Sequence, residues 1–86
     1  MPRICEFGGV RVLMYFGDHN PPHFHAKAGG DEALVEIETG LVAAGTLSRA
    51  DARVVERWRI ARLEELRANW LRATAGVPLM PIDPLD

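Results

Sequence analysis

Apolar and polar residues alternate along the first half of the chain with the two-residue period of β-strands. The clearest alternation covers residues 10–16. Its apolar face consists of Val10, Val12, Met14 and Phe16. This pattern predicts a strand with one buried face. Gly8-Gly9 before it marks a turn, and residues 3–7 are the candidate for a short additional edge strand.

A pair of glycines, Gly29-Gly30, divides the next alternating stretch and is typical of a two-residue hairpin turn, because such turns need positive φ. The cross-strand pairs counted outward from this turn are apolar on one face and mostly polar on the other. The apolar pairs are Ala26 with Ala33 and Phe24 with Val35, and the others are Lys27 with Glu32, His25 with Leu34, and His23 with Glu36. A shift of one residue would exchange the faces, so the pattern predicts a single register.

Thr39-Gly40 predicts a second tight turn by the same reasoning. The expected pairs, which extend the apolar face, are Ile37 with Val42 and Val35 with Ala44. Together these segments predict an antiparallel β-meander of three to four strands within residues 3–46. A sheet of this size needs another element to cover its apolar face.

Residues 48–74 have the composition and spacing of a helical segment that could provide this cover. Ser48 is the expected N-cap, with Asp51 three residues later, and Gly76 follows the last turn. The apolar positions change phase near residues 60–63, so either one helix bends there or two helices meet. We favour one long helix with a kink.

The remaining expectations complete an α+β fold. Trp58 and Trp70 are expected to anchor the core, and the single cysteine, Cys5, to be a partly buried strand residue. Residues 77–86 contain several prolines and predict an extended tail. We therefore expect residues 1–86 to form a single domain.

Composition limits the classes of protein that remain. No apolar run approaches the ~20 residues that span a bilayer, and the N-terminus lacks the pattern of a signal peptide. One cysteine allows no internal disulfide. We therefore expect a cytoplasmic protein without membrane association.

Charge is distributed unevenly along the chain, whose net charge is −2. The helical segment is basic, and Arg49, Arg53 and Arg57 recur every four residues along one helix face. This arginine row could bind nucleic-acid phosphates or an acidic partner. The alternative is a solvated face with ordinary salt bridges between neighbouring turns. The overall acidic charge does not favour a general nucleic-acid binder.

The histidines provide the second candidate chemistry, because all of them lie within the stretch DHNPPHFH. His23 and His25 should point the same way from one strand, with Glu36 opposite His23 and His19 nearby. Imidazoles and a carboxylate are suitable ligands for a divalent transition metal cofactor, and the same set could provide a catalytic base. The alternative is that they form an ordinary exposed strand face. No P-loop, dinucleotide-binding fingerprint, nucleophile elbow or HExxH motif occurs.

The chain resembles a small bacterial family, the domain of unknown function four-one-six-zero. The similar segments are PRICEFGGVRVLMYF, DHNPPHFHA, GGDEALVEIETG, ANW and GVPLMPIDPL. The positions that match the signature of the family are His19, Pro21, Pro22, His23, Phe24 and His25. The chain departs from the family at Gly8-Gly9 and in the apolar stretch LVAAG.

The resemblance implies a short stand-alone bacterial protein, often encoded beside another small protein. Such pairs look like toxin–antitoxin or small regulatory modules, and some members are described loosely as transcriptional regulators. No catalytic residues follow from the resemblance.

Our leading hypothesis is therefore an interaction module, one component of a toxin–antitoxin-like pair, with a small protein from a neighbouring gene as its partner. The alternatives are a metal-binding or hydrolytic enzyme that uses His19, His23, His25 and Glu36, and a nucleic-acid-binding regulator that uses the arginine row. A homo-oligomer is compatible with each.

Overall fold

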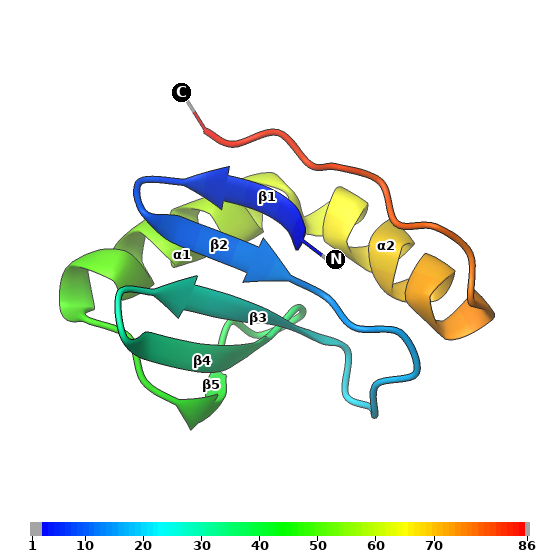
Figure 1. Cartoon of the computed structure of the whole chain (residues 1–86), viewed down its shortest axis with the longest axis horizontal. Coiled ribbons are helices and arrows are strands. Elements are labelled where there is room, and N and C mark those ends of the chain that lie inside the picture. The colour runs from blue at the N-terminus through cyan, green and yellow to red at the C-terminus, as the bar shows by residue number, and fades with distance from the viewer. Residues whose placement is uncertain (1–2, 86) are drawn as a thin grey trace.

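The computed structural model describes residues 3–85 and contains one antiparallel sheet followed by two helices (Figure 1). The elements are β1 (Arg3–Phe7), β2 (Val10–Leu13), β3 (His23–Ala28), β4 (Asp31–Glu36), β5 (Val42–Gly45), α1 (Arg49–Ala61) and α2 (Leu63–Ala75). The strands lie in chain order, which makes the sheet a meander. The predicted α+β class is confirmed, with five strands rather than three or four. The outermost residues of the predicted domain, 1–2 and 86, lie outside the described part.

The hairpin around Gly29-Gly30 has the predicted register. Every expected pair between β3 and β4 is present, from Ala28 with Asp31 to His23 with Glu36. The prediction succeeds because each face of the hairpin has its own consistent residue type, which excludes a one-residue shift.

The second turn differs from the prediction. Val35 pairs with Val42 and Leu34 with Ala44, so both expected pairs, Ile37 with Val42 and Val35 with Ala44, are wrong. The connection is longer than two residues because the N–H of Glu36 already donates to the carbonyl oxygen of Leu41. Ile37 instead leaves the ladder, donates its N–H to Pro22 and is fully buried.

The core lies between the apolar face of the sheet and the helices. The ring of Trp58 on α1 meets Phe24 of β3 edge-on, with 5.8 Å between ring centroids, and Trp58 and Trp70 are both buried. Cys5 is buried on β1. These core predictions are confirmed.

The helical region is divided into two helices, so the prediction of one long kinked helix is wrong. Ser48 caps α1 as expected, because its Oγ accepts a hydrogen bond from the N–H of Asp51. Helical geometry is interrupted at Arg62, whose φ is −116° and ψ 23°. Arg62 donates to the carbonyl oxygens of Asp83 and Pro84, so its side chain joins the helix junction to the tail. Within residues 3–85, no helix is long and apolar enough to cross a membrane.

The tail after α2 is extended, as predicted, and returns along β1 (Figure 1). The N–H of Ile82 donates to the carbonyl oxygen of Ile4 at 2.8 Å. The side chain of the buried Asn69 fixes the same tail by donating to and accepting from the backbone of Met80. The tail therefore joins the edge strand β1 to α2 and adds Ile82 to the core.

Candidate metal centre at the start of β3

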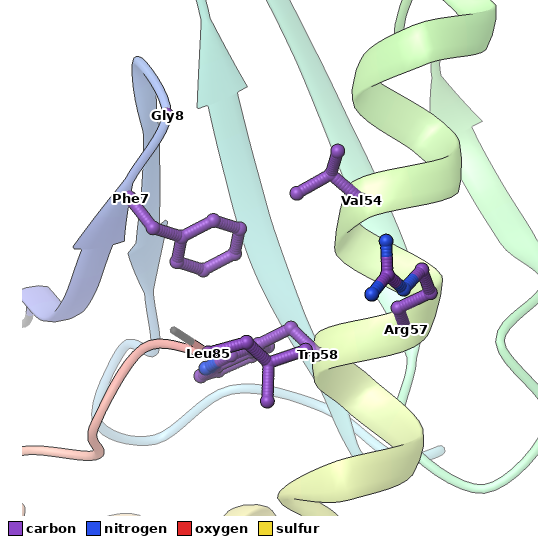
Figure 2. Close-up of a pocket in the computed structure, with 6 residues that line it drawn as sticks. All are labelled: Phe7, Gly8, Val54, Arg57, Trp58 and Leu85. Atoms are coloured by element: carbon purple, nitrogen blue, oxygen red, sulfur yellow. The ribbon is translucent and has the colours of Figure 1, made fainter.

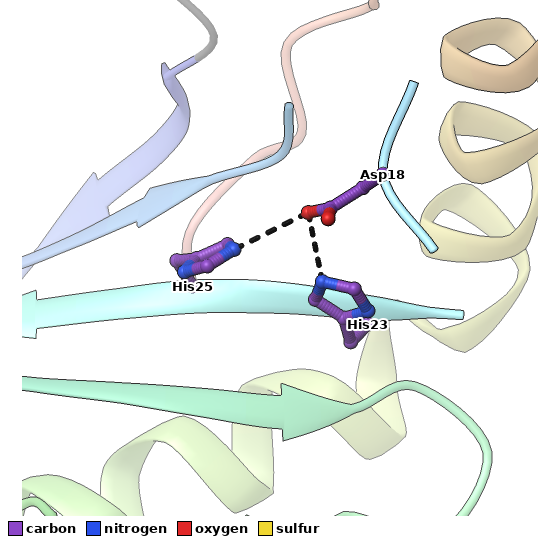
Figure 3. A group of neighbouring side chains, drawn as sticks. All are labelled: Asp18, His23 and His25. Carbon is purple, nitrogen blue, oxygen red and sulfur yellow. Dashed lines mark hydrogen bonds and ion pairs between the residues drawn. The ribbon is translucent and has the colours of Figure 1, made fainter. Parts of the chain in front are cut away.

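The loop of residues 14–22, between β2 and β3, brings an acidic side chain over the start of β3. The carbonyl oxygen of Pro22 accepts a hydrogen bond from Ile37, which ties the end of the loop to the region after β4. His23 and His25 are two residues apart on β3 and so project from the same face. Figure 3 shows both rings directed toward the carboxylate of Asp18 on the loop.

These three residues, which we call the histidine group, converge on one point. Asp18 Oδ2 lies 2.8 Å from His23 Nε2 and 3.4 Å from His25 Nε2. One potential ligand atom from each residue lies within 4.8 Å of the others. Among the described residues, this is the one such group of histidine, cysteine and acidic side chains.

The partners of the other ring nitrogens indicate which nitrogens carry hydrogen. His23 Nδ1 lies 2.8 Å from the carbonyl oxygen of Pro21, and His25 Nδ1 lies 3.4 Å from Glu32 Oε2. A carbonyl oxygen only accepts, so His23 Nδ1 is placed to donate. The contact between His25 Nδ1 and Glu32 is an ion-pair distance and not a hydrogen bond. With hydrogen on Nδ1, His23 presents the lone pair of Nε2 to the Asp18 carboxylate, and the two repel each other unless a cation, either a proton or a metal ion, lies between them.

Aromatic neighbours fix the two rings. His23 is only 5% exposed and its ring lies 5.3 Å from that of Trp70 on α2. The ring of His25 meets Tyr15 edge-on at 4.7 Å. Packing on both sides leaves the imidazoles few alternative rotamers, so the convergence on Asp18 is built into the fold.

Asp18 is the anionic member of the group. Burial acts most strongly on its pKa and raises it, but the hydrogen bond from the N–H of His19 and the contacts with His23 and His25 outweigh burial. The pKa of Asp18 is therefore lowered from its ordinary value. The carboxylate is charged at neutral pH and can attract a cation.

The structure brings together part of the residue set expected from the sequence. His23 and His25 belong to the group, whereas His19 is exposed and contributes its backbone N–H, which donates to Asp18 Oδ1. Glu36 pairs with His23 in the sheet, but its carboxylate accepts from Thr39 Oγ1. Asp18 takes their place as the third member of the group. Its place next to His19 in the sequence was the available signal, but the path of the loop was not predictable from strand periodicity.

The arginine row of Arg49, Arg53 and Arg57 lies exposed along α1. Among residues 3–85, none of the three forms a salt bridge. The salt bridge of Glu56 is instead made with Arg59. Arg57 borders a pocket of about 230 Å³ whose walls are largely apolar (Figure 2). The other lining residues are Phe7, Gly8, Val54, Trp58 and Leu85.

Comparison with known proteins gives one match. The model of a family described as "Domain of unknown function (DUF4160)" matches residues 9–71, which include β2 to β5, α1 and the histidine group. No curated protein and no solved structure matches the chain.

Proposed function

The chain belongs to the family described as a domain of unknown function (DUF4160), and we propose that it binds a divalent transition metal ion through Asp18, His23 and His25. The observation that carries this proposal is the convergence of two Nε2 atoms on one carboxylate oxygen, while His23 Nδ1 is hydrogen-bonded to the carbonyl oxygen of Pro21. A metal ion between the three ligand atoms would remove the repulsion between the lone pair of His23 Nε2 and the carboxylate.

The distances suit such an ion after small side-chain movements. Metal–ligand bonds of about 2.0–2.2 Å place two ligands of a tetrahedral ion about 3.3–3.6 Å apart. The Asp18–His25 distance of 3.4 Å already lies in this range, and the Asp18–His23 distance of 2.8 Å is shorter. A slight rotation of the Asp18 carboxylate, which belongs to a loop, would open the shorter distance.

The contacts behind the ligands also support a metal site. Metal-bound histidines usually donate their second ring N–H to a carboxylate or a backbone carbonyl, which fixes the ring and its tautomer. The carbonyl oxygen of Pro21 is placed to accept in this way from His23, and the Glu32 carboxylate lies 3.4 Å from His25 Nδ1.

Two histidines and one carboxylate are the ligand set of many zinc and non-haem iron(II) sites. Three protein ligands leave at least one coordination position for water or a substrate oxygen, as in catalytic rather than structural zinc sites. The group thus supports a site that binds or acts on a small molecule.

Metal titration of the chelator-treated full chain tests the proposal. We expect calorimetry to show one equivalent of Zn²⁺ bound per chain. Asp18→Asn and His25→Ala should each weaken binding by at least about tenfold, because changes even behind the ligands cost about that much. His19→Ala is the matched control, since this exposed histidine lies in the same loop and should leave affinity unchanged. Absence of binding would show that a proton fills the position instead, and equal weakening by His19→Ala would show that the ion does not bind at the Asp18–His23–His25 group alone.

A second candidate is the interaction module, one half of a toxin–antitoxin-like pair with a small protein from a neighbouring gene. The feature that favours it is β5, the edge strand, in which every residue is exposed. Val42 is 46% exposed, and no charged residue lies between Leu41 and Thr46. Uncharged, open edges pair readily with an extended segment of another chain.

Co-expression with the neighbouring gene product tests this second candidate. We expect the two proteins to purify together and Val42→Lys to separate them, because a charge blocks pairing at an edge. Ile60→Lys, at an exposed apolar residue of α1, is the control that should retain the complex. Recovery of the free chain alone, or loss of the complex in both variants, would reject β5 as the partner site.

A further inference from the structure

A group of cationic side chains lies on the same sheet face as the histidine group. Arg3 on β1, Arg11 on β2 and Lys27 on β3 surround Leu13 at a pocket of about 320 Å³. Leu13 is 3% exposed and forms an apolar floor. We call these four residues the cationic pocket.

The register of the sheet places the pocket beside the proposed metal ligands. Leu13 is the direct cross-strand partner of both Arg3 and His25, and Arg11 is the partner of Lys27. Direct partners project from the same face. Lys27 also follows His25 by two residues on β3, a separation of about 6.5–7 Å along the strand.

The charges within the pocket are only partly neutralised. Arg3 donates to Glu6 at 2.7 Å, and Lys27 lies 4.0 Å from Glu32. Arg11 forms no salt bridge with any residue of the described chain. It also stands directly opposite Lys27, which carries the same charge. Like charges at opposite positions destabilise a sheet, and an anion between them would reverse the sign of this interaction.

We propose that the cationic pocket binds the phosphate monoester group of a small molecule whose other end reaches the Asp18–His23–His25 centre. Guanidinium groups donate paired hydrogen bonds to phosphate oxygens, and an ammonium group adds a compact charge. The pocket volume is at the lower end of the range for small-molecule sites.

The surrounding acids argue against a nucleic acid as the ligand. Glu6 on β1 lies opposite Arg11, and Glu32 on β4 lies opposite Lys27, so acidic groups border the pocket on two sides. A polyanion extending across the sheet would meet these carboxylates, whereas a single phosphate group would not.

Phosphate binding itself does not depend on the metal, but the role of the phosphate as part of a ligand shared with the centre rests on the proposed function. The first test therefore uses chelator-treated protein and inorganic phosphate. We expect amide chemical shifts to change at β1, β2 and β3 on titration. Arg11→Gln and Lys27→Gln should each weaken binding roughly tenfold, the loss of one hydrogen bond to a charged group. Arg53→Gln, at an exposed arginine of α1, should have no effect.

Glu6→Gln sharpens this test in the opposite direction. It releases Arg3 from its salt bridge, so phosphate should bind more tightly than to the wild-type chain. Changes in amide chemical shift at other elements, or equal weakening of phosphate binding by Arg53→Gln, would overturn the proposal that phosphate binds at the cationic pocket. Tighter binding of a short single-stranded oligonucleotide than of phosphate, lost in the same variants, would overturn the small-molecule ligand.

The second test measures the link between the two sites with ribose 5-phosphate as the probe. We expect Zn²⁺-loaded wild-type protein to bind it several times more tightly than metal-free protein, and His25→Ala to lose this gain. Zn²⁺ binding without phosphate binding would overturn the pocket and leave the metal site intact. Phosphate binding without any gain from Zn²⁺ would overturn the shared ligand.

Discussion

The histidine group and the arginine row appear equally suggestive in the sequence, but the fold treats them differently. The histidine rings are packed against aromatic side chains, and the second ring nitrogen of His23 is hydrogen-bonded to the carbonyl oxygen of Pro21. The arginines are exposed on α1, and within the described chain none has an acidic partner. The difference shows that charge and spacing alone do not define a site. Side chains form a preorganised site when neighbours hold them from behind, because their conformational freedom has already been lost on folding.

Arg59 on α1 sharpens this comparison, because the fold holds this arginine on the same helix. Its side chain donates to both carboxylate oxygens of Glu56 and, at 2.7 Å, to the buried carbonyl oxygen of Ile37. We expect Arg59→Ala to lower the free energy of unfolding by about 3 kcal/mol, because these groups lose their donor. Arg53→Ala should change it by less than about 0.5 kcal/mol. Urea unfolding of both variants measures the difference, and equal effects would remove the distinction between held and free arginines.

Metal binding tests the histidine group, the other half of this comparison. At a Zn²⁺ concentration about 100 times Kd, the ion should stabilise the fold by about 2.7 kcal/mol. For a domain of this size, the melting temperature should rise by roughly 10 °C or more. At the same Zn²⁺ concentration, a tenfold weaker site stabilises by only about 1.4 kcal/mol, so Asp18→Asn should roughly halve the rise or reduce it further. A variant with Gln at Arg49, Arg53 and Arg57 should keep the full rise. An undiminished rise in Asp18→Asn would place the ion elsewhere.

The parts of the fold that local pattern determines were predictable from the sequence. The Gly29-Gly30 hairpin was one, because its two strands carry the complete information on register. The role of Gly40 was not predictable, because it depends on residues far away in the sequence. A side chain at this position would collide with Glu56 and Arg59 on α1, and its φ is +78°. A tight-turn signal and a close helix contact both select glycine, and only the fold distinguishes them.

The candidate site shows the same division. That His23 and His25 share a face follows from strand periodicity, and it was predictable. The third member of the group was not, because Asp18 reaches the histidines through an irregular loop whose end is tied to Ile37 by a hydrogen bond. The opposite neighbour expected from register, Glu36, turns to Thr39 instead.

The pH dependence of unfolding is the smallest of the expected effects. It compares Glu56, whose carboxylate is bonded to Arg59, with an exposed glutamate. The hydrogen bond from Arg59 lowers the pKa of Glu56, although burial acts against it. A carboxyl whose pKa is lower in the folded state stabilises the fold above its unfolded pKa, here near the ordinary value of 4.5. This contribution is lost as the pH falls from about 4.5 through the lower pKa of the folded state. We therefore expect Glu56→Gln to flatten the fall in stability below pH 4.5, as measured by urea unfolding at several pH values. Glu65→Gln, at an exposed residue of α2, is the control and should keep the wild-type pH profile. If the free energy of unfolding falls as steeply below this pH in Glu56→Gln as in the wild-type chain, Arg59 is held by the carbonyl oxygen of Ile37 alone.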